Sequence, residues 1–207
     1  MVKFSFNVFA YDLERAIRII RRGLDAAERA LHDEEEAVSR QIDDLKLRIE
    51  NGQHPGYQVD NEFHVIDDPF EFHNYDLETI EETQIEVRKA MLLALYHAWE
   101  RVARDMTGLK GNESHQVIKE AMAAQGVEQV DELDHLRKTV NLIKHNSEPK
   151  MKALWKVRQD LFINGFNPDM HFPHDWNDAL RITSNHVTSF IDAVIASGPT
   201  QEPRAIT

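Results

Sequence analysis

Residues 12–31 read DLERAIRIIRRGLDAAERAL, and the spacing of their apolar side chains decides the fold class. These side chains recur three or four residues apart, and the same spacing resumes at Val38 after an acidic run and continues to Ile49. An alternating 4-3 spacing is typical of a helix that buries one face. The pattern therefore predicts one helix over residues 12–50. A helix of this length, about 57 Å at roughly 1.5 Å per residue, needs a long partner in the same chain or in another.

The partner in the same chain is predicted over residues 76–106, where apolar side chains again keep helical spacing. Asp76 is a suitable N-cap, and Gly108 closes the segment. The two segments are expected to form a long antiparallel helical hairpin. Residues 54–75 form an irregular connection between them, with a short strand candidate at 59–65.

The remaining chain also has helical spacing, interrupted by turn residues. Further helices are expected over about 114–125, 130–145, 149–163 and 176–196. The last residues, 198–207, contain two prolines and no periodicity, so we expect a disordered tail. The resulting prediction is all-α: a helical bundle that forms a single domain over residues 1–197, with motif-bearing helices in 114–163.

Composition excludes several classes of protein. With no cysteine among 207 residues, the chain cannot form disulfides or a thiolate zinc site. No stretch approaches the roughly 18–20 apolar residues of a membrane span, and the first twelve residues do not have the layout of a signal peptide. There is no Gly-rich phosphate loop. We therefore expect a cytoplasmic protein without membrane association.

Charge is distributed unevenly along the chain, whose net charge is −12. Residues 49–87 hold eleven acidic residues and no Lys or Arg, whereas residues 137–158 hold seven basic residues and one acidic residue. One interpretation is that both stretches are simply solvated surfaces. The alternatives are that the basic stretch binds a polyanion, and that the acidic stretch neutralises a basic partner, as an antitoxin or immunity protein does.

The strongest candidate site lies in residues 137–146, RKTVNLIKHN. On a helix Arg137, Asn141 and His145 are four residues apart and share a face, with Lys144 at its margin. This set suits a phosphodiester, because Arg and Lys hold the phosphate, Asn orients it and His transfers a proton near neutral pH. The alternative is a surface helix end at which His145 interacts with the helix dipole.

Residues 141–145, NLIKH, near the end of a helix, resemble the motif of the HEPN superfamily, in which an Arg, often followed by Asn, precedes a His. Residues 96–101, YHAWER, are similar to the central helix that packs against the motif helix in such proteins. The resemblance covers about residues 76–163 and implies a helical bundle that commonly dimerises. Many HEPN proteins are metal-independent endoribonucleases of toxin–antitoxin and other bacterial defence systems. Val140 stands where the motif has its Arg.

The resemblance leads to two hypotheses. In the first, the chain is an endoribonuclease in which His145 is the general base and then the acid, Arg137 and Lys144 stabilise the transition state, and Asn141 orients the phosphate. In the second, which we favour because the motif Arg is absent, the chain is an interaction module for protein or RNA. Both imply a homodimer or a protein partner bound through the long N-terminal helix, and neither requires a cofactor or a metal.

Two further groups of histidines are candidates. His97 and Arg101 are four residues apart in the predicted central helix, so they are expected either to line the same cleft as His145 or to be satisfied in the core. His171 and His174, next to Asp175, have a spacing that zinc ligands can use. Because they lie in a loop interrupted by proline, we interpret them as ordinary loop histidines and predict no metal site.

Overall fold

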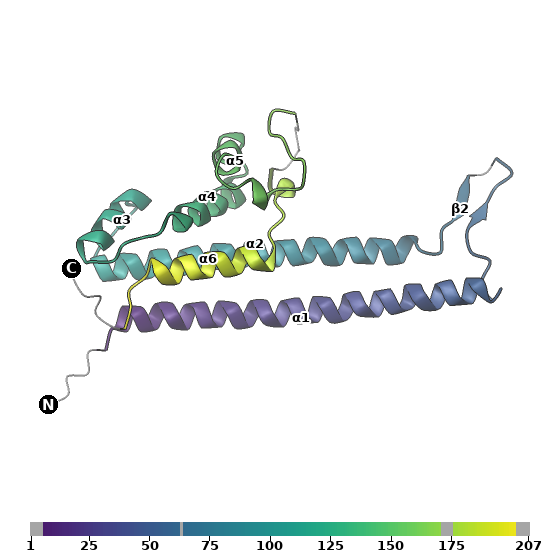
Figure 1. The fold of residues 1–207 in the computed structure, drawn as a ribbon, viewed down its shortest axis with the longest axis horizontal. Coiled ribbons are helices and arrows are strands. Elements are labelled where there is room, and N and C mark those ends of the chain that lie inside the picture. The colour runs from purple at the N-terminus through teal and green to yellow at the C-terminus, as the bar shows by residue number, and fades with distance from the viewer. Residues whose placement is uncertain (1–5, 63, 171–175, 202–207) are drawn as a thin grey trace. The chain divides into compact units, whose positions relative to one another are not determined.

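A computed structural model of the chain describes residues 6–62, 64–170 and 176–201. These residues are mostly helical, as predicted, and form the elements shown in Figure 1. In chain order the elements are α1 (Val8–Glu50), β1 (Gln58–Val59), β2 (Val65–Asp67), α2 (Glu71–Thr107), α3 (His115–Ala124), α4 (Asp131–His145), α5 (Glu148–Trp155), η1 (Gln159–Leu161), η2 (Trp176–Ala179) and α6 (Ser184–Ala196). No helix in the described part of the chain has the length and apolarity that crossing a bilayer requires.

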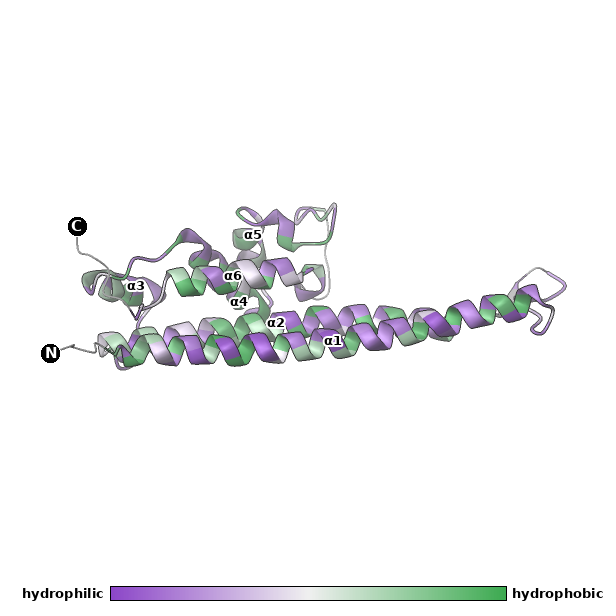
Figure 2. Ribbon diagram, turned by 60° about the horizontal axis from the view of Figure 1, so that its bottom comes forward, coloured by the Kyte–Doolittle hydropathy of each residue, from purple (hydrophilic) through white to green (hydrophobic). Residues whose placement is uncertain are grey.

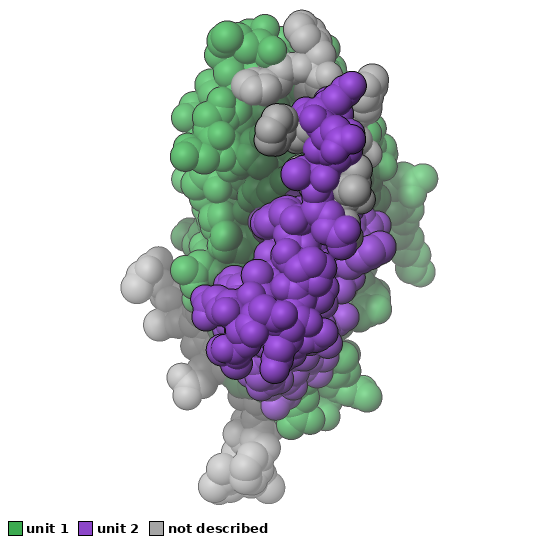
Figure 3. Space-filling model, turned by 90° about the vertical axis from the view of Figure 1, so that its right-hand side faces the viewer, with its two compact units in different colours: residues 1–24, 88–207 green, residues 25–87 purple. Residues whose placement is uncertain are grey.

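The chain divides into two compact units, coloured separately in Figure 3. Unit 1 comprises residues 1–24 and 88–207, and unit 2 comprises residues 25–87. The boundaries fall inside α1 and α2, so each long helix contributes to both units. The single domain over residues 1–197 remains a prediction.

Unit 2 contains the second part of α1, the first turns of α2 and a two-stranded ribbon between them. Val38 and Leu45 of α1 and Ile80 and Ile85 of α2 are its buried apolar side chains. The ribbon pairs β1 with β2 in antiparallel register, where we expected one strand in an irregular connection. Helix α2 also begins five residues before the predicted start at Asp76.

Helix α1 continues without interruption through the acidic run 33–36. Ion pairs one turn apart compensate the run, since His32 Nε2 lies 3.5 Å from Glu36 Oε1 and Arg40 Nη1 lies 3.7 Å from Glu36 Oε2. Hydrophilic and hydrophobic residues alternate along the whole helix in Figure 2. The lapse in the apolar stripe is therefore a solvated turn and not a helix end.

Unit 1 holds the larger core. Its fully buried side chains come from α2 and every following helix, and the largest are Trp99, Phe190, Leu92, Leu95, Ile118, Met122, Leu133, Leu136, Leu142, Met151, Leu154 and Leu161. The first part of α1 also packs in this unit, where Met91 Cε would lie 3.5 Å from a Cβ placed on Gly23. The long antiparallel hairpin over both units remains a prediction.

Two predicted helices are shorter than expected. The segment expected over 149–163 ends as α5 at Trp155, because Arg158 adopts an extended φ of −144° and starts the 3₁₀ turn η1. The segment expected over 176–196 begins instead as the 3₁₀ turn η2, and the α-helix starts only after Thr183. Phe162 directly follows η1 and Leu180 directly follows η2, and these two residues form an isolated antiparallel bridge, which a continuous helix would preclude.

The predicted disordered tail is partly ordered. Gly198 and Pro199 are buried, and the Asn7 side chain donates a hydrogen bond to the Thr200 carbonyl at 3.1 Å. The Gln201 side-chain amide donates to the Asn7 carbonyl at 3.2 Å. Residues 198–201 therefore pack against the start of α1 in unit 1, and residues 202–207 lie outside the described chain.

Candidate functional site

Helix α4 carries the candidate motif and is well matched to its own dipole. Three acidic residues occupy its first turn, and Lys144 and His145 occupy its last turn. Asn146 ends the helix in a left-handed conformation, with φ of 41°. The Asn146 side chain accepts a hydrogen bond from the Trp176 backbone N–H at 2.8 Å, which fixes the end of α4 against η2.

The structure places the motif residues on a partly accessible face of α4. Lys144 and His145 are exposed, whereas Arg137 and Asn141 are half-buried. The side chains of Asn141 and His145 make no hydrogen bond or ion pair with any described residue. Val140 is only 1 % exposed and belongs to the core, so the position at which the HEPN resemblance would place an arginine is buried.

Arg137 is partly committed to another group. Its Nε lies 3.6 Å from Asp134 Oδ1, one turn earlier on α4. The contact is an ion pair without a hydrogen bond, because Arg137 Nε is buried and has no hydrogen-bond partner among the described residues. About a third of the Arg137 side chain is exposed, so the rest of the guanidinium group is accessible to solvent.

His97 of α2 contacts the motif face, which is the face of α4 that carries Arg137, Asn141, Lys144 and His145. Its Nε2 lies 3.5 Å from Lys144 Nζ, and its Nδ1 lies 3.6 Å from Glu100 Oε2. Both contacts are longer than an ordinary hydrogen bond, so the three groups are neighbours without a short hydrogen bond between them. Glu100, His97 and Lys144 thus form a carboxylate–imidazole–ammonium series at the surface of unit 1.

Arg101 does not join this group. It lines a separate hollow of about 320 Å³ in unit 1, together with residues of α1. The other lining residues are Phe9, Asp12, Arg15, Ala16, Ile19, Val102 and Asp105. With two arginines and two aspartates the hollow has balanced charge, so it selects neither anions nor cations.

A polar cluster that no motif in the sequence indicated joins α2, α3 and α4 in unit 1. Tyr96 Oη is 3.0 Å from His115 Nδ1, and His115 Nε2 is 3.0 Å from Asp134 Oδ1. Lys119 Nζ donates to Asp134 Oδ2 at 3.0 Å. The rings of Tyr96 and His115 also pack against Trp99, so the cluster connects α2, α3 and α4.

Burial controls the protonation of this cluster. It lowers the pKa of His115 to about 4, with the nearby Arg137 charge acting in the same direction and Asp134 opposing it. Burial also raises the pKa of Tyr96. For Asp134 burial acts upward, but the hydrogen bond and charge of Lys119 outweigh it and lower the pKa. At neutral pH the cluster therefore contains a neutral Tyr, a neutral His and a charged Asp–Lys pair.

The predicted basic stretch 137–158 is partly neutralised by the fold. Arg158 pairs with Glu132 and with Asp160, and its guanidinium carbon lies 5.1 Å from the centre of the Phe190 ring. Lys152 Nζ lies 2.9 Å from Glu148 Oε1 and 3.2 Å from Asp169 Oδ1. The cations without an acidic partner among the described residues are Lys138, Lys144, Lys150 and Lys156.

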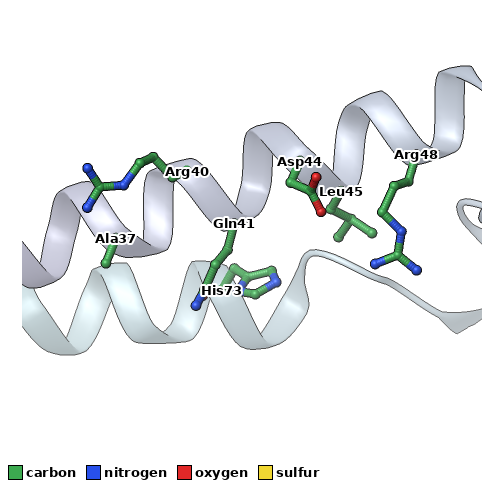
Figure 4. A pocket seen from close by; sticks show the side chains of 7 residues that line it. All are labelled: Ala37, Arg40, Gln41, Asp44, Leu45, Arg48 and His73. Carbon is green, nitrogen blue, oxygen red and sulfur yellow. The ribbon is translucent and has the colours of Figure 1, made fainter.

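Unit 2 contains a second hollow, of about 530 Å³, shown in Figure 4. Gln41 of α1 and His73 of α2 lie close together in it, while Arg40 points to the outside. His73 Nδ1 is buried and has no hydrogen-bond partner among the described residues. The charged lining residues are Arg40, Arg48 and Asp44, so the lining carries one more positive than negative charge.

In the described residues, no group of three or more His, Asp or Glu side chains is arranged to hold a metal ion. The histidine pair His171 and His174, with Asp175, lies outside the described residues. Comparison of the chain with protein-family models, with curated proteins and with solved structures finds no match.

Proposed function

We propose that this chain is a HEPN-like helical protein of a bacterial defence or toxin–antitoxin system that acts as an RNA-interaction module with a degenerate motif. The observation that carries the proposal is the 3.5 Å contact between Lys144 and His97 on the face that also holds Arg137 and Asn141. Ammonium, guanidinium, amide and imidazole groups are the donors that hold RNA phosphates. The buried Val140 supports binding without efficient cleavage.

The distribution of charge between the units supports the same proposal. Unit 2 has 19 acidic and 4 basic residues, a formal charge of −15, whereas the whole chain has a charge of −12. Unit 1, which carries the motif face, therefore has a formal charge of +3. The negative net charge of the chain thus comes from unit 2, and unit 1, which would bind RNA, is not acidic overall.

The expected binding is weak and sensitive to salt. Each phosphate contact to a single strand contributes a slope of about −0.7 to the dependence of log K on log salt concentration. With a few available lysines near the motif face, we expect a slope of about −2 to −3 and a dissociation constant of roughly 10⁻⁶–10⁻⁴ M at physiological salt.

Fluorescence anisotropy with a labelled 20-nucleotide single-stranded RNA, at 50 and 200 mM NaCl, tests the proposal. We expect Lys144→Ala and Asn141→Ala to weaken binding about five- to tenfold, since each removes one phosphate contact. Lys110→Ala is the matched control, because it removes the same charge from the exposed loop after α2. No binding by the wild type, or an equal loss in the Lys110 variant, would contradict the proposal.

A metal-independent endoribonuclease is the second candidate, and the Glu100–His97–Lys144 series favours it. A carboxylate that orients an imidazole beside a cation is the arrangement of a general base next to a phosphate. The HEPN resemblance gives the base role to His145, which has no such carboxylate within the described chain. The attack of the ribose 2′-OH would leave a 2′,3′-cyclic phosphate without a metal.

Cleavage of the same RNA by micromolar protein in EDTA tests the second candidate. Loss of the base should reduce the rate by about 10²–10⁴. His145→Ala and His97→Ala, measured in parallel, identify which histidine transfers the proton, and Arg137→Ala tests charge stabilisation. If the wild type leaves the RNA intact while binding it, the interaction module stands and the enzyme candidate fails.

We also propose that α1 mediates dimerisation or binds a protein partner. In unit 1 its surface exposes Val8, Tyr11 and Ile19, of which Ile19 is 61 % exposed. Exposed apolar side chains on one helix are a feature of protein interfaces. A dimer would bring two motif faces into one assembly, as the HEPN resemblance implies.

A further inference from the structure

Unit 2 is the acidic part of the molecule, and its acidity is concentrated outside α1. All four of its basic residues belong to α1, whereas residues 49–87 have none. Two of these four are held locally, because Arg40 pairs with Glu36 and Lys46 pairs with Asp43. The carboxylates of residues 49–87 therefore have few cations within their own unit.

The first turns of α2 also expose large aromatic side chains. Phe72 is 80 % exposed and Tyr75 is 67 % exposed. The two residues are three apart, so they lie on the same face of the helix. Exposed Phe and Tyr side chains are characteristic of binding surfaces, where they supply most of the contact energy.

This face continues along the helix with polar and acidic residues. We name it the acidic–aromatic face, and its residues, all exposed, are Phe72, Tyr75, Asp76, Thr79, Glu82 and Thr83. The Thr79 hydroxyl donates to the Tyr75 carbonyl at 2.9 Å, and the Thr83 hydroxyl donates to the Thr79 carbonyl at 2.7 Å. The threonines are thus satisfied within the helix, so the aromatic rings and the carboxylates are the groups that remain for a partner.

The opposite side of the same helix packs in the interior of unit 2. Ile80 and Ile85 are buried there, and His73 lines the hollow shared with α1. The acidic–aromatic face is therefore not required for the unit's own core. Asp76 and Glu82 make no ion pair with any described residue.

We propose that the acidic–aromatic face docks a segment of another protein that is rich in Arg and Lys. Guanidinium groups stack on exposed aromatic rings and form charge-assisted hydrogen bonds with neighbouring carboxylates. Nucleic acid is disfavoured by like charge, and a second copy of this face would bring two units of charge −15 together. The inference depends on unit 2 alone and is independent of the RNA-binding proposal for α4.

The test is fluorescence anisotropy of the full chain with a fluorescein-labelled peptide of alternating Arg and Lys residues at low salt. We expect Phe72→Ala combined with Tyr75→Ala to weaken binding about tenfold, since both cation–π contacts are lost. Asp76→Asn combined with Glu82→Gln should weaken it by a similar factor of about ten. Circular dichroism should be unchanged, because all four positions are exposed.

The matched control neutralises two acidic residues elsewhere on unit 2. Glu34→Gln combined with Glu35→Gln changes the net charge by the same amount on exposed turns of α1, and we expect it to change binding by less than about twofold. An equal loss in this control would show that the peptide responds only to net charge. Retention of full affinity by the Phe72 and Tyr75 variant would equally overturn the proposal.

Discussion

The hydroxyl of Tyr96 lies 3.0 Å from Nδ1 of His115, and this contact joins α2 to α3 in the interior of unit 1. The other ring nitrogen of His115, Nε2, lies 3.0 Å from Asp134 Oδ1 of α4. From its position at the start of α3, His115 therefore lies within 3.0 Å of polar side-chain atoms of both α2 and α4, although its Nε2 makes no hydrogen bond with a described residue. Because His115 is neutral in this position, the connection depends on pH.

Acidification should destabilise the fold through His115. Its pKa is about 4 in the folded protein, whereas the unperturbed value is 6.5, so the unfolded chain takes up a proton first as pH falls. The contribution of His115 to the free energy of unfolding is fully present above pH 6.5. As the pH falls from 6.5 to 4, this contribution is lost, and the loss reaches about 3 kcal/mol. His115→Gln should flatten the dependence of the free energy of unfolding on pH between 7 and 5.

Urea unfolding monitored by circular dichroism at several pH values measures this effect. His145→Gln is the control, because it removes an exposed histidine and should keep the wild-type pH dependence. Part of the dependence should survive in His115→Gln, since burial also lowers the pKa of His186. Identical slopes for the wild type and His115→Gln would contradict the prediction.

Two glycine-to-alanine substitutions should have opposite effects on stability. A Cβ on Gly198 would collide with Leu13 Cδ2 and would lie 3.1 Å from the Val194 carbonyl oxygen, and Leu13 is buried. We expect a loss of about 1–3 kcal/mol for Gly198→Ala from overpacking. Gly23→Ala, in the middle of α1 with only one ordinary contact, should gain about 0.5–1 kcal/mol from helix propensity. Thermal unfolding of both variants checks the pair.

Ser197→Ala should destabilise the protein by about 0.5–1.5 kcal/mol, because it removes the acceptor of a part-buried hydrogen bond. The Ser197 hydroxyl accepts a hydrogen bond from the Val130 backbone N–H at 3.0 Å, just before α4. Ser189→Ala is the matched control, since Ser189 is exposed on α6. Equal stabilities of the two variants in urea would contradict the role given to Ser197.

The proposed dimer predicts a change in mass after a single substitution on α1. Ile19→Glu places a charge in the exposed apolar surface and should convert the dimer to monomer in light scattering. Ser39→Glu adds the same charge to an exposed position of α1 in unit 2 and should leave the mass unchanged. A monomeric wild type would remove the dimer from the proposal.

The helices could be predicted from the sequence where periodicity was strong. The apolar spacing from Leu13 to Leu31 and again from Val38 to Ile49 identified α1 as one helix, because the same spacing resumes after the acidic run. Periodicity did not locate the break at Arg158 or the late start at Thr183. The break follows the ion pair of Arg158 with Glu132, which is a tertiary contact. The start of α6 is set by a capping box between Thr183 and His186, which depends on local cap geometry.

The candidate site could be predicted only in part. The face of Arg137, Asn141 and Lys144 follows from helical spacing within α4, so the sequence was sufficient for it. The contact of Lys144 with His97 joins residues 47 positions apart, and the cluster around His115 draws on three helices. No sequence pattern around His115 identifies it as a member of this cluster, because its role depends on burial among three helices, which only the packed structure shows.

The hydrogen bonds between Asn7 and residues 200–201 also affect how the chain is made on the ribosome. Residue 200 is synthesised about 10–40 s after residue 7 at ordinary rates of translation. During this interval Asn7 lacks these hydrogen bonds, and Leu13 lacks its neighbour Gly198. The start of α1 is therefore among the last parts of unit 1 to acquire its native contacts during synthesis.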